Sequence, residues 1–196
     1  MYLRFGKRLF DFSFALLGLL LAAIPMLVIS LLLWAGSGRP ILFTQDRVGR
    51  GGRLFRIKKF RTMYVKQPTT STVTVNGDPR ITPLGRILRR YKLDELPQLW
   101  NVLVGEMSFV GPRPDVPGYA DKLQGDDRRL LLLRPGITGP ATLAYRNEEE
   151  LLAGVPDPIK YNDEVIYPDK VRLNLEYLDH CSLGVDLRCL WRTLSG

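Results

Sequence analysis

The sequence predicts an α+β fold, in which a small mixed domain of several helices and short strands sits on an N-terminal re-entrant membrane helix hairpin with interfacial amphipathic helices. Three observations predict it: an uncharged stretch over residues 12–38, a strand-prone stretch over 41–63, and helical periodicity in several later segments. A chain of 196 residues fits one domain with an appended anchor. We expect residues 1–38 to form the hairpin, broken at Pro25, and residues 39–196 to form the cytosolic and interfacial domain that carries the candidate site.

The hairpin prediction depends on charge and on one proline. Residues 12–38 are 27 uncharged residues, enough to cross a bilayer core of roughly 30 Å, and hydropathy alone predicts a single-pass helix. Pro25 lies at the centre, removes one backbone donor and clashes with the Leu21 carbonyl, so we expect a break there. Basic flanks stay cytoplasmic, and here both flanks are basic: Arg4, Lys7 and Arg8 before the stretch, and Arg39, Arg47, Arg50 and Arg53 after it. Each half, about 20 Å long, therefore enters the membrane and returns to the same side.

The remaining chain reads as short elements. Residues 41–63 predict two strands around a glycine-rich turn, and helices are expected over 84–90, 96–104 and 121–133. Residues 64–79 are polar and residues 153–168 contain three prolines, so both are expected to be loops. The last helix carries an apolar stripe at 183, 187, 190, 191 and 194, which faces either the core or a membrane surface.

Composition and charge narrow the function classes. Hydrophobic residues at 45% and charged residues at 24% exclude a disordered chain. Two cysteines, Cys181 and Cys189, cannot form a disulfide framework and suit a reducing compartment. The lone His180 is interpreted as an ordinary surface or core side chain, which excludes a His-rich metal site and a Ser-His-Asp triad.

The net charge of +8 hides three blocks: residues 1–37 carry +2, residues 38–92 carry +12 and residues 93–196 carry −6. The middle block suits anionic lipid, nucleic acid or a polyphosphate ligand. Nucleic acid is disfavoured, because the rest of the chain is acidic and aromatic residues are not interleaved with the bases as stacking platforms.

Asp94 and Glu95 form the first candidate site, at the start of the helix expected over 96–104. Such a pair is usually a solvated partner of the helix dipole. Here it follows a run of cations, which would keep both carboxylates ionised: Arg86, Arg89, Arg90 and Lys92. An ionised aspartate can attack phosphorus, and two carboxylates without histidine suit Mg²⁺.

Two further segments are candidates for binding phosphate. Prolines on both sides restrict the backbone at Arg113, so that its guanidinium could clamp a phosphate, although a rigid turn with an exposed arginine is the simpler interpretation of the pattern by itself. Residues 58–63 carry Lys58, Lys59 and Arg61 on a predicted strand, where a solvated edge strand is the simpler interpretation.

Taken together, these blocks resemble one known family. They are FTQDRVG at 43–49, KFRTM at 59–63, DPRIT at 78–82, LDELPQL at 93–99, NVLVGEMSFVGPRP at 101–114 and RPGITG at 134–139. The sequence resembles the bacterial sugar transferases, specifically the small monotopic phosphoglycosyl transferases, over nearly its whole length and in order.

The resemblance implies transfer of a sugar-1-phosphate from a UDP-sugar to a polyprenol phosphate, usually undecaprenyl phosphate, with release of UMP. The place implied is the cytosolic face of the bacterial inner membrane, against its anionic lipid, as the initiating step of surface glycan synthesis. It implies Mg²⁺ held by Asp94 and Glu95, Asp94 as the nucleophile of a glycosyl-phosphoryl-aspartate intermediate, and Glu95 as its assistant. Arg89 and Arg113 match arginines of the family, and the matching blocks imply that Lys59, Arg61 and Arg134 also bind substrate.

Two positions depart from the family pattern. Ile24 stands where many members have serine before the hairpin proline, and Asn174 stands where many have an acidic residue. Three alternatives remain open: an inactive membrane-anchored scaffold, a basic nucleic-acid-binding membrane protein, and an alcohol phosphatidyltransferase, which would need more hydrophobic segments. The sugar, the glycan pathway and the oligomeric state are not encoded in any pattern that we recognise.

Overall fold

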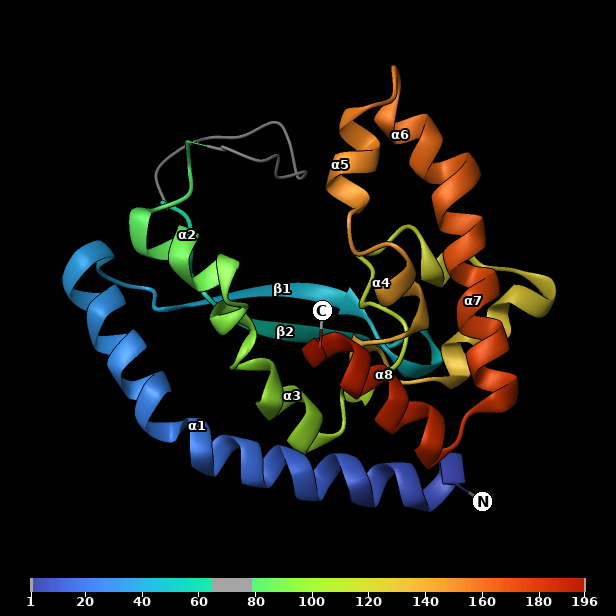
Figure 1. The fold of residues 1–196 in the computed structure, drawn as a ribbon, viewed down its shortest axis with the longest axis horizontal. Coiled ribbons are helices and arrows are strands. Elements are labelled where there is room, and N and C mark those ends of the chain that lie inside the picture. Colours follow the sequence, from blue (N-terminus) through green and yellow to red (C-terminus); the bar gives the residue numbers. More distant parts are fainter. Residues whose placement is uncertain (1, 65–78, 196) are drawn as a thin grey trace.

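The computed structural model describes residues 2–64 and 79–195 (Figure 1). Asp78 of the DPRIT block and nearly all of the loop expected over 64–79 lie outside the described residues. The chain combines many helices with two small sheets, which confirms the prediction of a mixed fold.

Helix α1 (Lys7–Ser37), which follows one π-helical turn (Tyr2–Gly6), is long and apolar enough to cross a membrane by length and composition. It runs along one side of the molecule and bends part-way along its length (Figure 1). Pro25 lies inside the helix, so the predicted break between two helices is a bend within one continuous helix. Ser30 Oγ donates to the Met26 carbonyl at 2.7 Å in the turn after the proline. The re-entrant path through a membrane stays a prediction.

Strands β1 (Leu42–Val48) and β2 (Leu54–Phe60) form the hairpin predicted for residues 41–63. They pair antiparallel, with Leu42 opposite Phe60 and Val48 opposite Leu54. A 3-10 turn (Arg50–Gly52) joins them, and Gly51 and Gly52 adopt positive φ values of 70° and 77° that favour glycine.

Helices α2 (Pro83–Arg90) and α3 (Gln98–Val104) confirm two predicted helices, with a 3-10 turn η3 (Leu93–Glu95) between them. Thr82 caps α2 by accepting from the Gly85 amide, and Pro83 occupies the first turn. Helix α3 packs against α1, where a Cβ at Gly18 would lie 3.3 Å from the Leu99 side chain.

The second sheet pairs β3 (Ser108–Val110) in parallel with β4 (Gly136–Thr138). The two segments approach so closely that a Cβ at Gly136 would lie 2.2 Å from the Gly111 nitrogen. Gly111 and Gly136 belong to two of the sequence blocks, so close backbone packing explains why glycine stands at both positions.

Two segments of the C-terminal half differ from the sequence prediction. The helix expected over 121–133 is two stretches of 3-10 helix (Ala120–Lys122 and Gly125–Leu132), because Gly125 has a φ of 58° and interrupts it. The loop expected over 153–168 is largely helical, because Pro158 and Pro168 each lie in the first turn of a helix, where proline is tolerated. The helices here are α4 (Pro140–Ala144), α5 (Glu148–Ala153), α6 (Pro158–Tyr161), a π-turn (Asn162–Ile166), α7 (Tyr167–His180) and α8 (Leu183–Ser195).

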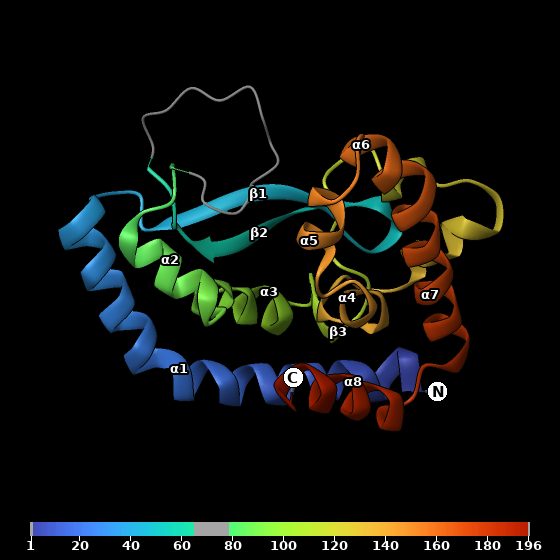
Figure 2. The same ribbon diagram turned by 45° about the horizontal axis from the view of Figure 1, so that its top comes forward.

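Helix α8 lies beside the N-terminal half of α1 in both ribbon views (Figures 1 and 2). Its polar Asp186 and its Cys189 are buried, whereas most of the predicted apolar stripe is exposed: Leu183, Leu187, Trp191 and Leu194. The core-facing alternative is therefore wrong for most of the stripe, and the membrane-surface alternative stays a prediction. Cys181 and Cys189 are both free, and His180 is an exposed side chain, as expected.

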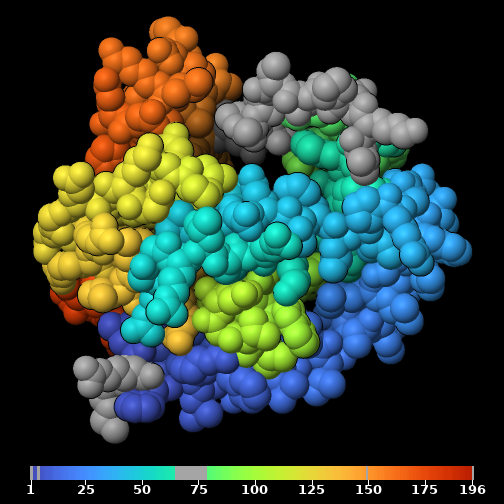
Figure 3. All heavy atoms as spheres, turned by 180° about the vertical axis from the view of Figure 1, so that it is seen from behind, coloured from blue at the N-terminus to red at the C-terminus, as the bar shows by residue number. Residues whose placement is uncertain are grey.

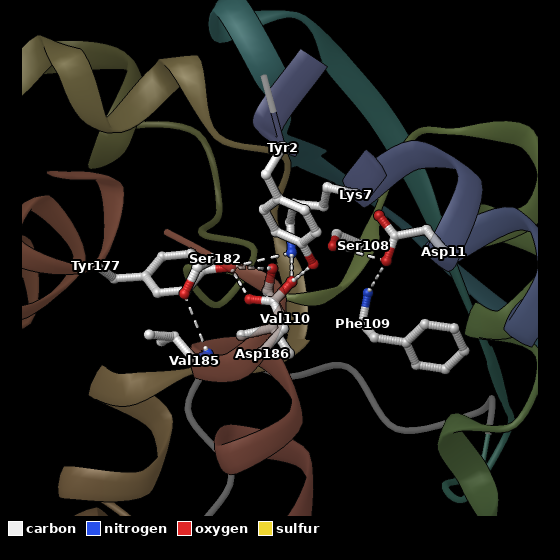
Figure 4. A network of polar contacts seen from close by, with 10 residues as sticks. All are labelled: Tyr2, Lys7, Asp11, Ser108, Phe109, Val110, Tyr177, Ser182, Val185 and Asp186. Carbon is white, nitrogen blue, oxygen red and sulfur yellow. Dashed lines mark hydrogen bonds and ion pairs between the residues drawn. The ribbon is translucent and has the colours of Figure 1, made fainter. Parts of the chain in front are cut away.

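A buried polar network ties the start of α1 to α7 and α8 (Figure 4). Lys7 Nζ lies 2.6 Å from Asp186 Oδ2, which also accepts from the Tyr2 hydroxyl at 2.6 Å, and Tyr177 donates to Asp186 Oδ1. Asp11 accepts from Ser108 and from the Phe109 amide. The start of α1 is thus part of the domain core and is more than an appended anchor.

Candidate active site

The Asp94–Glu95 pair lies in η3, in the short connection between α2 and α3. Lys92, directly before this turn, adopts left-handed backbone angles of φ 56° and ψ 19°. A non-glycine residue in this region costs about 1–2 kcal/mol and is found often at functional sites. The unusual backbone at Lys92 turns the chain so that both acidic residues lie between two helices.

Asp94 is buried, with 8% of the residue exposed. Its Oδ1 atom has no hydrogen-bond partner among the residues that the structure describes. Burial raises the pKa of Asp94, and the neighbouring Glu95 charge raises it further against the opposing effects of Lys59 and Arg89. Nearby cations lower the pKa of Asp94, as expected, but burial and the Glu95 charge outweigh them, so the net shift is upward.

Glu95 is held by a lysine from the first hairpin. Lys59 Nζ lies 2.6 Å from Glu95 Oε1, and both side chains are mostly buried. Burial raises the pKa of Glu95, but the Lys59 charge and hydrogen bond outweigh it, with help from Arg113 and Lys92, so the pKa lies below its ordinary value. The two pKa values therefore shift in opposite directions, upward for Asp94 and downward for Glu95, although the two residues are neighbours in the sequence.

Arg89 is positioned by the packing of α2 on the segment after β2. Its Nε donates to Thr62 Oγ1 at 2.8 Å, and the Thr82 amide donates to the Thr62 carbonyl at 2.9 Å. A Cβ at Gly85 would lie 2.2 Å from the Thr62 carbonyl oxygen, so only glycine permits this approach. The guanidinium of Arg89 thereby lies near enough to Asp94 to lower its pKa.

Arg113 reaches the same site from the loop after β3. It is exposed, and its charge acts on Glu95 and on Asp115. The structure thus brings together five predicted site residues from β2, α2, η3 and the loop after β3: Lys59, Arg89, Asp94, Glu95 and Arg113.

Asp115, two residues later, is a candidate that the sequence reasoning missed. Burial raises its pKa to about 6, against the lowering effects of Lys170, the Tyr167 hydroxyl, Arg47 and Arg113. It lines a small pocket with Arg113, whose other walls are mostly apolar: Val48, Gly49, Pro112, Ala120, Leu130, Leu131, Leu133 and Pro135. Its position two residues after Arg113 was the only signal in the sequence. Tyr167 and Lys170, which act on Asp115 in the structure, come from a segment that was predicted to be loop or left unassigned.

Two arginines that were predicted to bind substrate donate hydrogen bonds to backbone carbonyls away from the carboxylate pair. Arg61 is buried and donates through Nη2 to the Ser37 and Gly38 carbonyls at the end of α1. Arg134 donates from Nε to the Gly105 carbonyl, which lies at the opposite end of α3 from Asp94. Neither guanidinium lies among the charges that act most strongly on Asp94 or Glu95.

The two departures from the family pattern fall in different surroundings. Ile24 is exposed on α1 beside Pro25, so no hydroxyl from that position contacts the freed carbonyl. Asn174 is buried on α7, and its Oδ1 atom has no partner within the described part of the chain. The structure does not connect Asn174 to the carboxylate pair by any contact between described residues.

The carboxylate pair fits a hard cation. An oxygen of Asp94 without a protein donor, next to a second carboxylate, is the donor set that Mg²⁺ shares with substrate phosphates. Within residues 2–64 and 79–195, no group of three or more Asp, Glu, His or Cys side chains gathers to form a closed metal cage. The pair would therefore supply only part of the coordination of a cation, and oxygens of a ligand would supply the rest.

A buried carboxylate pair whose pKa values shift in opposite directions, surrounded by lysine and arginine, is typical of a functional site. The comparison with known proteins gives the family. A family model described as bacterial sugar transferase matches residues 2–196, and the chain belongs to that family.

Several relatives of known name are similar over most of this chain. The galactosyl transferase CpsE of Streptococcus agalactiae is 34% identical over 201 residues, which cover 96% of this chain and 41% of that protein. The exopolysaccharide production protein PSS of Rhizobium leguminosarum is 36% identical over 96% of this chain and 92% of its own length. A putative undecaprenyl-phosphate N-acetylgalactosaminyl 1-phosphate transferase of Bacillus subtilis is 42% identical over 121 residues, 61% of this chain and 68% of that protein. The chain thus spans about two fifths of the Streptococcus relative and most of the Rhizobium one.

Proposed function

We propose that this chain transfers a sugar-1-phosphate from a UDP-sugar to a polyprenol phosphate and releases UMP. The observation that carries the proposal is the buried carboxylate pair, in which Lys59 holds Glu95 while Asp94 Oδ1 accepts no hydrogen bond from the described residues. The Bacillus relative, named as a transferase of a sugar 1-phosphate to undecaprenyl phosphate, supports the reaction class.

In the first step, a carboxylate oxygen of Asp94 attacks the phosphorus that carries the sugar. A P–O bond to Asp94 forms, the P–O bond to the nucleoside monophosphate breaks, and UMP leaves with the electron pair of that bond. The ionised form of Asp94 is required, and its raised pKa makes it more basic than an ordinary aspartate.

In the second step, an oxygen of the polyprenol phosphate attacks the same phosphorus. The bond to Asp94 breaks, which restores the carboxylate and gives a polyprenyl diphosphate sugar. Glu95, which Lys59 holds in place, takes the proton that the incoming phosphate loses.

The cations around the pair have matching roles. Arg89 and Lys59 lie near Asp94, and Arg113 lies near Glu95, so they surround the place where the diphosphate must lie. Asp94 and Glu95 would hold Mg²⁺, which when bound neutralises part of the charge of the diphosphate. Arg61 and Arg134 are assigned no contact with the diphosphate, because Arg61 donates to carbonyls at the end of α1 and Arg134 lies at the opposite end of α3 from Asp94.

The membrane supplies the acceptor in this proposal. Helix α1, re-entrant at the cytosolic face of the bacterial inner membrane, would hold the site at the headgroup layer, where a polyprenol phosphate presents its charged end. The proposed reaction would initiate assembly of a surface glycan.

The test is the intact mass of the detergent-solubilised chain after incubation with Mg²⁺ and each of a panel of UDP-sugars, without acceptor, with UMP release measured in parallel. We expect a mass gain of one sugar-phosphate with the correct donor and none in Asp94→Asn. UMP release that appears only when undecaprenyl phosphate is added, without an adduct, would keep the reaction and contradict the covalent route. Neither adduct nor UMP with any donor would favour the inactive-scaffold alternative.

A further inference from the structure

Three arginine side chains meet at the C-terminal end of α3, away from the carboxylate pair. Arg8 donates to the Val102 carbonyl at 2.7 Å and to the Leu103 carbonyl at 2.6 Å, and a Cβ at Gly105 would lie 3.2 Å from its guanidinium carbon. Arg134 donates to the Gly105 carbonyl at 2.9 Å. Two guanidinium groups thus flank one glycine, in orientations fixed by backbone carbonyls.

The third member is Arg50, at the turn between β1 and β2. Burial lowers the pKa of Arg134, and the charges of Arg50 and Arg8 lower it further. The space-filling view from behind shows the β1–β2 turn beside the start of α1 and the end of α3 (Figure 3). Segments far apart in the sequence therefore build one basic cluster, which we define as Arg8, Arg50 and Arg134.

No carboxylate neutralises this cluster within the described residues. Its three arginines form none of the ion pairs found there. Asp11 is the acidic group that acts on Arg134, and it already accepts from Ser108 and from the Phe109 amide. Glu106, next to Gly105, accepts from Asn101. The three positive charges thus form no ion pair among the described residues, and Asp11 is the one acidic group there whose charge acts on Arg134, so an external anion would stabilise the cluster.

The cluster lies where the apolar helix begins. Arg8 is the second residue of α1, and its guanidinium lies 5.7 Å from the centre of the Phe12 ring. Phe5 and Leu9, on either side of it in the sequence, are exposed by 74% and 69%. An arginine at the boundary between an exposed apolar surface and a polar domain lies at headgroup depth when the helix enters a membrane.

From these observations we infer a binding site for the phosphate group of an anionic membrane phospholipid, formed by Arg8, Arg50 and Arg134. Arginine suits phosphate because its planar group donates in pairs to two oxygens. The site is separate from the carboxylate pair, because Arg134 and Asp94 lie at opposite ends of the seven-residue helix α3, about 10 Å long. A bound headgroup would fix the depth and tilt of the domain on the membrane.

The test measures lipid binding to the detergent-solubilised full chain by native mass spectrometry. Dioleoyl-phosphatidylglycerol is titrated against the chain, with dioleoyl-phosphatidylcholine as the lipid without net charge and inorganic phosphate as the source without acyl chains. Arg50→Gln is the chosen variant, because Arg50 is exposed and caps no helix, so the fold is retained. Arg188→Gln, at an exposed arginine of α8, is the control with the same loss of charge.

We expect tighter binding of phosphatidylglycerol than of phosphatidylcholine, weakened about fivefold in Arg50→Gln and unchanged in Arg188→Gln, since one arginine near anionic lipid contributes about 1 kcal/mol. Equal affinity for the two lipids, or an equal loss in the two variants, would overturn the site. If inorganic phosphate at the same concentration displaced phosphatidylglycerol, the cluster would be a site for free phosphate, and the proposal of a lipid site would be overturned.

Discussion

The Lys7–Asp186 and Lys59–Glu95 pairs have the same Nζ–O distance of 2.6 Å, but they differ in how far they are buried and in which groups surround the carboxylate. Lys7 and Asp186 are 4% and 0% exposed, and both oxygens of Asp186 accept from tyrosines or lysine. Lys59 and Glu95 are 22% and 17% exposed and lie beside Asp94, which keeps one oxygen without a donor. Asp186 is thus satisfied by groups of the chain itself, whereas Asp94 Oδ1 has no hydrogen-bond partner among the described residues.

The comparison separates two uses of a buried charge. In the Lys7 network every charge has partners from within the chain, so its removal should reduce stability. In the Asp94 site the charges are only partly compensated, so changes there should affect reaction and pH dependence more than folding. The following predictions test this separation, in order of the expected effect on stability.

Lys7→Met should give the largest loss of stability. It leaves Asp186 charged and fully buried, which costs about 3–5 kcal/mol when one partner of a buried pair is removed. The measurement is unfolding in detergent, by denaturant or by temperature. The double variant Lys7→Met with Asp186→Leu removes both charges and should recover most of the loss; a double variant as unstable as Lys7→Met would contradict this explanation.

Gly85→Ala should have an intermediate effect. The added Cβ would lie 2.2 Å from the Thr62 carbonyl oxygen, so α2 must move away, at a cost of about 1–3 kcal/mol. Because α2 carries Arg89, we also expect weaker transfer activity. Gly36→Ala is the matched control, since nothing lies within 4 Å of a Cβ at Gly36. Equal stability of the two variants would show that α2 does not need this close contact.

Lys59→Met should change stability least and pH dependence most. Lys59 lowers the pKa of Asp94, so its removal raises that pKa further, and the ionised nucleophile is then lost at higher pH. In a pH profile of adduct formation, the acid limb should move to higher pH. Glu95→Gln removes a charge that raises the pKa of Asp94, so its acid limb should move the other way. Shifts of the same sign in both variants would contradict the assigned electrostatics.

Much of the fold could be predicted because its signals are local. The glycine-rich turn between the two strands and the helix expected over 84–90 depend on short-range features, and both were found where expected. The loop predicted for 153–168 was wrong because a proline in a first turn and a proline in a loop give the same local pattern. A break was predicted at Pro25, whereas α1 continues through Pro25, because a local clash does not determine whether a helix breaks or curves.

The site was predictable only in part. Asp94 and Glu95 were found from the cations beside them in sequence, and Lys59 from its block. The sequence did not show which groups Arg61 and Arg134 contact. An arginine that donates to backbone carbonyls and an arginine that binds a phosphate are the same residue type. The Lys7–Asp186 pair joins residues 179 positions apart, and no local pattern marks it.

The central claim is that Asp94 acts in the reaction and Asp186 in folding. The direct test measures, side by side, the unfolding temperature and the sugar-phosphate adduct per folded molecule in Asp94→Asn and Asp186→Asn. We predict that Asp94→Asn keeps the wild-type unfolding temperature and forms no adduct, whereas Asp186→Asn unfolds at a lower temperature and still forms the adduct below it. An undiminished adduct in Asp94→Asn would contradict the account.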